Sequence, residues 1–128
     1  MNEIKIIECP RDAMQGIKPF IPTERKVKYI QSLLRVGFDT IDFGSFVSPK
    51  AIPQMQDTAE VLAQLDLSKT RSKLLAIIAN TQGAETASKH KAIQYLGFPF
   101  SGDRCCRPQA YMAIAPAADA LIDLVEPY

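Results

Sequence analysis

The chain has 128 residues, enough for one domain with a hydrophobic core of its own. Its 15 Lys and Arg residues nearly balance 14 Asp and Glu residues, so bulk charge gives no reason to expect a nucleic-acid partner. No apolar run is long enough to span a bilayer, and the N-terminal MNEIKIIECPRD is charged too early for a signal peptide. We therefore expect a cytoplasmic protein that has no membrane partner and keeps its three cysteines reduced.

The first third of the chain predicts two strands separated by one helix. Residues 4–7 are a β-branched run, typical of a buried strand, and it ends at a loop that begins with Cys9-Pro10. Residues 23–36 predict a helix that Gly37 ends, and residues 38–43 predict a second strand. A polar loop at 44–50 follows this strand. On the helix we expect the basic side chains to face solvent, namely Arg25, Lys26 and Lys28.

Two further pairs of elements follow in the same order. Residues 57–65 and 83–91 predict helices, and residues 74–79 and 93–98 predict strands. Strands that alternate with helices at a spacing of roughly thirty residues are typical of βαβ units, whose right-handed crossovers make a parallel sheet. The pattern predicts an α/β fold of about four parallel strands, and leaves open whether the sheet is doubly wound or part of a barrel.

The character of the chain changes after Ser101. Residues 102–108 are polar and turn-prone, and the Ala-rich stretch from Tyr111 to Val125 predicts a helix that Pro116 interrupts. We therefore divide the chain into an α/β part, residues 1–101, and a C-terminal helical tail, residues 102–128.

Two loops carry a resemblance to a known family. Pro10-Arg11-Asp12 with Gln15 follows the first predicted strand, and SFVSPK (45–50) with PQM (53–55) follows the second. These stretches resemble the hydroxymethylglutaryl-CoA lyase family, metal-dependent lyases built on a TIM-type (β/α) barrel. The resemblance covers about Ile4 to Ser101 and implies the N-terminal half of such a barrel.

The resemblance also implies a chemistry and a set of roles. These lyases cleave a 3-hydroxy-3-methylglutaryl thioester to acetyl-CoA and acetoacetate, a step of leucine degradation, and so imply an acyl-CoA partner. By resemblance, Arg11 is the catalytic cation that stabilises the enolate and Asp12 binds a divalent cation, Mg²⁺ or Mn²⁺. Asp42 stands where the lyases have a catalytic Glu. The weaker candidates for substrate binding are Gln15, Ser45 and Lys50.

Other features depart from the family. The family completes its metal site with a His-x-His pair and supplies a catalytic Cys from a glycine-rich loop, whereas this sequence has one histidine, His90, expected on the solvent side of a helix. Neither Cys105 nor Cys106 lies in such a loop. The alternative is a truncated, non-catalytic half-barrel that acts only through assembly, because four parallel strands leave open edges at the first and last strand. A change of reading frame after Ser101 is a further interpretation of the tail.

Overall fold

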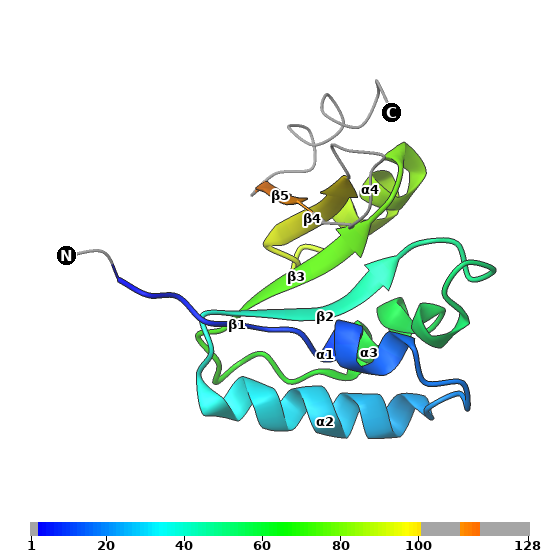
Figure 1. Cartoon of the computed structure of the whole chain (residues 1–128). Coiled ribbons are helices and arrows are strands. Elements are labelled where there is room, and N and C mark those ends of the chain that lie inside the picture. The colour runs from blue at the N-terminus through cyan, green and yellow to red at the C-terminus, as the bar shows by residue number, and fades with distance from the viewer. Residues whose placement is uncertain (1–2, 101–110, 116–128) are drawn as a thin grey trace.

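A five-stranded sheet organises the protein (Figure 1), seen in a computed structural model that describes residues 3–100 and 111–115. The strands lie in chain order, β1-β2-β3-β4-β5, and the first four are parallel, whereas β5 is antiparallel to β4. This confirms the α/β fold with four parallel strands. The strands are β1 (Ile7–Glu8), β2 (Thr40–Phe46), β3 (Lys73–Ile78), β4 (Tyr95–Phe100) and β5 (Tyr111–Ala115).

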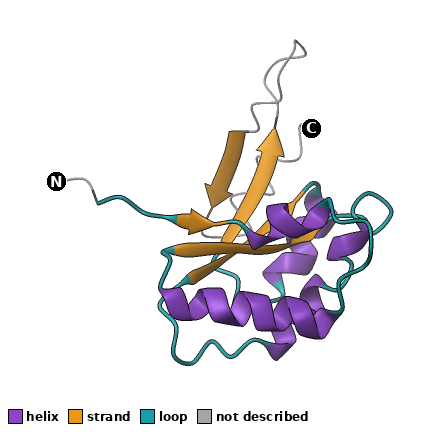
Figure 2. Cartoon of the chain, turned by 60° about the horizontal axis from the view of Figure 1, so that its bottom comes forward, coloured by secondary structure: helices purple, strands orange, loops and turns teal. Residues whose placement is uncertain are grey.

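The helices gather against one face of this sheet (Figure 2). Helix α2 begins and ends where the sequence predicts, because Gly37 follows it with a φ of 92°, a left-handed conformation that favours glycine. Helix α4 begins at its N-cap Asn80, whose side chain accepts a hydrogen bond from the Gly83 N–H at 2.8 Å. The helices are α1 (Pro10–Gln15), α2 (Thr23–Val36), the short 3₁₀ helix η1 (Pro53–Met55), α3 (Thr58–Gln64) and α4 (Thr81–Ser88).

The core fills the space between the sheet and these helices. Strand β3 is buried from Leu74 to Ile78, as its continuous apolar sequence predicts. Its alternate residues Leu74, Ala76 and Ile78 join the core that faces the helices. Gly83 allows α4 to approach β2 closely, because a Cβ at this position would lie 2.5 Å from the Phe46 carbonyl oxygen. Within the described residues, no helix is long and apolar enough to cross a membrane.

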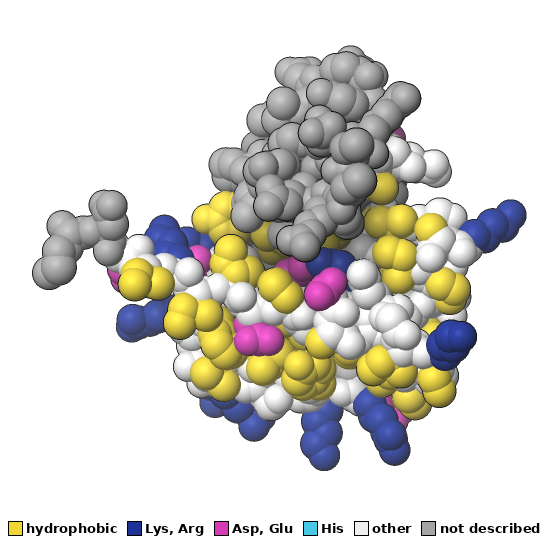
Figure 3. All heavy atoms as spheres, in the orientation of Figure 1, with side chains coloured by type: hydrophobic (Ala, Val, Ile, Leu, Met, Phe, Trp, Pro, Cys, Tyr) yellow, Lys and Arg dark blue, Asp and Glu magenta, His cyan; other side chains and the backbone are white. Residues whose placement is uncertain are grey.

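The N-terminal strand is shorter and more exposed than predicted. Only Ile7 and Glu8 pair with β2, and the Ile4 and Ile6 side chains are 89% and 60% exposed. Figure 3 shows hydrophobic side chains at the surface beside the N-terminal end of the chain. The prediction of a buried strand over residues 4–7 is wrong, because β1 lies at the sheet edge and has one neighbouring strand among the described residues.

The end of the sheet also differs from the prediction. Residues 111–115, predicted as part of a helix, form β5, which pairs with β4 from Leu96 to Phe100. Backbone pairing with an otherwise open edge outweighs the helical propensity of the Ala-rich sequence. The prediction that the fourth strand keeps an open edge is therefore wrong as well. Residues 102–110 and 116–128 of the predicted tail lie outside the described residues.

Helix α2 contains one exception to its solvated basic face, along which Lys and Arg side chains project in Figure 3. The prediction that Lys26 faces solvent is wrong, since this side chain is 2% exposed. Its Nζ lies 2.6 Å from Asp57 Oδ1 and also donates to the Gln54 carbonyl oxygen. Arg25 and Lys28 are exposed as predicted.

Candidate active site

The first candidate residues stand at the junction between β1 and α1. Instead of the predicted loop, a helix starts at Pro10 directly after the strand, and proline suits the first turn because it has no N–H to leave unpaired. Met14 is buried and anchors α1 to the core. Arg11 and Asp12 are therefore presented from the first turn of a helix at the carboxyl end of the sheet.

Arg11 extends from α1 to the neighbouring strand β2. Its Nε is 3.0 Å from both carboxylate oxygens of Asp42, and its Nη2 is 2.9 Å from Asp42 Oδ2. Its Nη1 donates to Gln15 Oε1 at 2.7 Å. These contacts use one N–H on each of the three guanidinium nitrogens, so two of the five donors have no partner among the described residues.

Asp42 is fully buried, with 0% of its surface exposed. The register between β2 and β3 shifts between Asp42 and Gly44, an irregularity of the kind that re-aims side chains in strands. Burial raises the pKa of the Asp42 carboxyl above its ordinary value, and the hydrogen bonds and charge of Arg11 oppose that rise. The ion pair thus offsets part of the cost of burying this carboxylate.

Cys9 lies beside this pair as a free thiol. Burial raises the pKa of the Cys9 thiol, and the negative charge of Asp42 raises it further, although Arg11 opposes both effects. A thiol with a raised pKa is protonated near neutral pH and is a weak nucleophile.

Asp12 is exposed to solvent beside the pair. Its side chain is 69% exposed and its Oδ1 is 3.9 Å from Arg11 Nη1. Mg²⁺ needs a near-octahedral set of oxygen ligands, and no three His, Cys, Asp or Glu side chains within 3–100 and 111–115 are placed to hold a metal. Asp12 is an accessible carboxylate at this end of the sheet, and the described residues do not form a metal centre by themselves.

The predicted substrate-binding residues are not brought together. Gln15 contacts Arg11, whereas Ser45 is buried and its Oγ has no hydrogen-bond partner in the described part of the chain. Ser45 lines a pocket of about 460 Å³ between the end of β2 and the start of α4. Lys50 is exposed on the loop after β2, and its backbone N–H donates to Ser48 Oγ at 3.3 Å. His90 follows α4, rather than lying in a helix, and stacks on Phe46 with ring centroids 5.4 Å apart.

Sequence reasoning assigned no role to Gln54. This side chain, in the PQM stretch, is 3% exposed and forms three hydrogen bonds to the backbone of the loop between α1 and α2. Its place in the PQM stretch, which is part of the resemblance, was the one indication of a role in the sequence. Nothing in the spacing indicates which loop the amide contacts.

Comparisons with known proteins agree with the resemblance seen in the two loops. No family model matches the chain. The bovine mitochondrial hydroxymethylglutaryl-CoA lyase is 48% identical over 62 residues, which are 48% of this chain and 19% of the bovine protein. The rat cytoplasmic 3-hydroxy-3-methylglutaryl-CoA lyase is 35% identical over 85 residues, 66% of this chain and 24% of the rat protein.

A solved structure supports the same relationship in three dimensions. The HMG-CoA lyase of Acinetobacter baumannii, in complex with coenzyme A and 3-methylmalate, superposes with a TM-score of 0.72 at 35% identity, and the match covers 78% of this chain and 32% of that one. The protein therefore resembles HMG-CoA lyases over its N-terminal part and shares part of their (β/α) barrel. It spans less than a third of the length of the curated relatives that it matches.

Proposed function

We propose that this chain carries the guanidinium part of a carbon–carbon lyase site that acts on a 3-hydroxy-3-methylglutaryl thioester. The observation that carries the proposal is the Arg11 side chain, fixed by Asp42 and Gln15 at the carboxyl ends of two parallel strands and with two N–H donors left. The likeness of the N-terminal part of the chain to lyases supports the choice of reaction.

The reaction explains why such a cation is needed. A base removes the proton of the tertiary hydroxyl and the new carbonyl of acetoacetate forms. The bond between this carbon and the methylene carbon next to the thioester breaks. The electron pair of that bond becomes the enolate of acetyl-CoA, which is then protonated on carbon. Arg11 would stabilise the enolate oxygen through its remaining N–H groups, since a pre-oriented donor lowers the energy of developing negative charge.

The geometry favours a positioning role for Asp42 in this reaction. Asp42 is fully buried and both of its oxygens accept from the Arg11 guanidinium, which leaves no exposed oxygen to take a proton from a substrate hydroxyl. Asp42 would hold the plane of the guanidinium, and Gln15 would fix its other side. Ser45, near the end of β2, and Lys50, in the loop after it, are our proposed contacts for the acyl-CoA.

We also propose that a divalent cation binds at Asp12. Asp12 would provide one oxygen ligand to Mg²⁺ or Mn²⁺, and further ligands would have to come from groups other than the described residues. Titration of the protein with Mn²⁺, followed by water proton relaxation, should show weak binding that Asp12→Asn abolishes. Equal binding by both proteins would contradict the assignment of Asp12.

Turnover is the direct test of the lyase proposal. The purified full chain, incubated with 3-hydroxy-3-methylglutaryl-CoA and Mn²⁺ or Mg²⁺, should release acetoacetate. Arg11→Lys should reduce the rate by about 10²-fold, because a lysine cannot reproduce the forked pairing with Asp42. Gln31→Ala, on the outer face of α2, should leave the rate unchanged. An absence of acetoacetate at high protein concentration would contradict activity in this chain.

Assembly without catalysis is the second candidate, and the exposed start of the sheet favours it. Ile4, Ile6 and Ile7 present apolar surface beside the edge of β1 that no described strand pairs with. A second copy of the chain could pair at this edge. Sedimentation over a range of concentrations should then detect a dimer that Ile6→Lys disrupts, and a monomer at every concentration would contradict this candidate.

A further inference from the structure

The side chain of Gln54 makes three hydrogen bonds to the backbone of the loop between α1 and α2, residues 16–22. Gln54 Nε2 donates to the carbonyl oxygens of Ile17 at 2.7 Å and Pro19 at 3.1 Å, and Gln54 Oε1 accepts from the Ile21 N–H at 2.8 Å. The loop contains no helix or strand, so this amide supplies the backbone with the partners that a neighbouring strand would otherwise provide.

Gln54 is itself fixed by a buried ion pair. Lys26 Nζ donates to the Gln54 carbonyl oxygen and to Asp57 Oδ1, and it lies 4.1 Å from the centroid of the Phe20 ring. Asp57 Oδ2 also accepts from Thr23 Oγ1 at 2.7 Å. The backbone of η1 is thereby tied to the first turns of α2, and the ring of Phe20 in the loop covers the ammonium group.

The loop continues directly from the helix that carries Arg11. Gln15, the last residue of α1, accepts from Arg11 Nη1, and the Ile17 N–H donates to the Met14 carbonyl oxygen at 3.0 Å. The backbone of residues 14–17 thus links the segment that Gln54 holds to Gln15, whose side chain contacts Arg11. Helix α1 has six residues, too few to keep its last turn in place without tertiary contacts.

We propose that Gln54, held by the Lys26–Asp57 ion pair, is a positioning residue that fixes the loop 16–22 and through Gln15 sets the orientation of the Arg11 guanidinium. The inference deepens the proposed function, since it assigns a support to the cation of that site. Its test uses the free protein, so failure of the lyase activity and failure of this inference are separate results.

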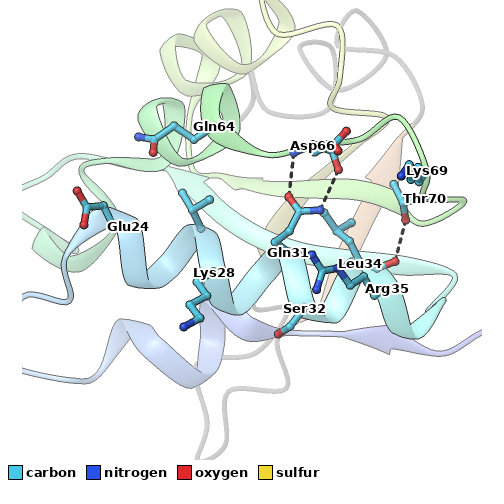
Figure 4. A pocket seen from close by; sticks show the side chains of 11 residues that line it. Glu24, Lys28, Gln31, Ser32, Leu34, Arg35, Gln64, Asp66, Lys69 and Thr70 are labelled. Carbon is cyan, nitrogen blue, oxygen red and sulfur yellow. Dashed lines mark hydrogen bonds between the residues drawn. The ribbon is translucent and has the colours of Figure 1, made fainter.

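The test compares two glutamines of the same kind. Gln31 on α2 also bridges backbone, because its Nε2 donates to the Asp66 carbonyl oxygen at 3.0 Å and its Oε1 accepts from the Asp66 N–H at 2.8 Å (Figure 4). It lines the outer groove beside α2 and has no link to the loop 16–22. Gln31→Ala is therefore a matched control for Gln54→Met.

Hydrogen exchange of the Arg11 Nε–H, followed by ¹⁵N NMR, is the readout. In Gln54→Met it should accelerate by about tenfold or more, because the guanidinium loses a fixed partner, whereas Gln31→Ala should leave it unchanged. The pKa of the Asp42 carboxyl, followed by ¹³C NMR, should rise in Gln54→Met, since Arg11 would oppose the effect of burial less well. Unchanged exchange and titration in a folded Gln54→Met protein would overturn the inference.

The wild-type protein provides a second test that does not depend on whether a variant folds. If Gln54 supports Arg11, the Ile21 N–H and the Arg11 Nε–H should lose protection together as denaturant is added, in one opening reaction. An opening that exposes the Ile21 N–H while the Arg11 Nε–H stays protected would overturn the inference.

Discussion

Two ion pairs in this protein each join a cation on a helix to a buried aspartate, and they differ in what the cation can still bind. Lys26 is 2% exposed, and two hydrogen bonds and an aromatic ring surround its ammonium group. Arg11 is 13% exposed and keeps two N–H groups without a partner among the described residues, at the edge of the sheet where an exposed carboxylate, Asp12, stands beside it. Both pairs bury a charge, and the donors that Arg11 keeps are what distinguish its guanidinium from the enclosed ammonium group of Lys26.

The largest effect on stability should come from breaking the buried ion pair between Lys26 and Asp57. Asp57→Ala leaves the Lys26 ammonium buried without its counter-charge and should lower the free energy of unfolding by about 3–5 kcal/mol. Urea denaturation measures the loss. The double variant Lys26→Met/Asp57→Leu removes both charges and should recover most of the stability, and a double variant as unstable as Asp57→Ala would show that the cost is not electrostatic.

Removal of Arg11 should have a smaller effect that depends on pH. Arg11→Met leaves the buried Asp42 carboxylate without its donor and should cost about 2–3 kcal/mol at pH 7. The pKa of Asp42 in the folded protein is already raised by burial, and the variant raises it further. A carboxyl group whose pKa is higher in the folded protein than in the unfolded chain stabilises the fold at a pH below the unfolded pKa. This contribution is lost as the pH rises through the folded pKa.

The variant should therefore be closest to the wild type in acid and fall behind as the pH rises above the unfolded pKa of Asp42. Urea midpoints measured from pH 4 to pH 8 for both proteins check this. A constant difference across that range would contradict the assignment of the loss to the Asp42 charge.

Arg11→Lys should sharpen the comparison, because it makes this position resemble Lys26. The charge is kept but the fork that contacts both oxygens of Asp42 is lost, so we expect a loss of about 1 kcal/mol, with a pH dependence close to that of the wild type. Urea denaturation at pH 7 gives the number. A loss as large as that of Arg11→Met would indicate that the shorter lysine does not reach Asp42.

The smallest effect is expected at Asp12. Its side chain is 69% exposed and 3.9 Å from Arg11, so Asp12→Asn should change the free energy of unfolding by less than about 0.5 kcal/mol. Thermal and urea unfolding of the variant should match the wild type. A large loss would mean that Asp12 supports the fold rather than being available to a ligand.

Most of the fold could be read from the sequence because its signals are local. The apolar period of α2 and the glycine after it, the continuous apolar run of β3, and the alternation of strands and helices each depend on neighbouring residues. The stretches PRD and SFVSPK predicted the family resemblance in the same way. The contact between Arg11 and Asp42 came only from the structure, in which β1 and β2 are neighbouring parallel strands.

Tertiary structure alone decided the edges of the sheet and the partners of the charges. Residues 4–7 have the composition of a buried strand, yet their isoleucines are exposed. Residues 111–115 have the composition of a helix, yet they form a strand. Whether the edge of a strand is paired depends on residues far away in the sequence, which a local sequence pattern does not include. Lys26 looks like a solvated helix residue until Asp57, 31 positions later, is brought to 2.6 Å. Which charge is enclosed and which keeps free donors depends on these long-range contacts, and no spacing along the chain records them.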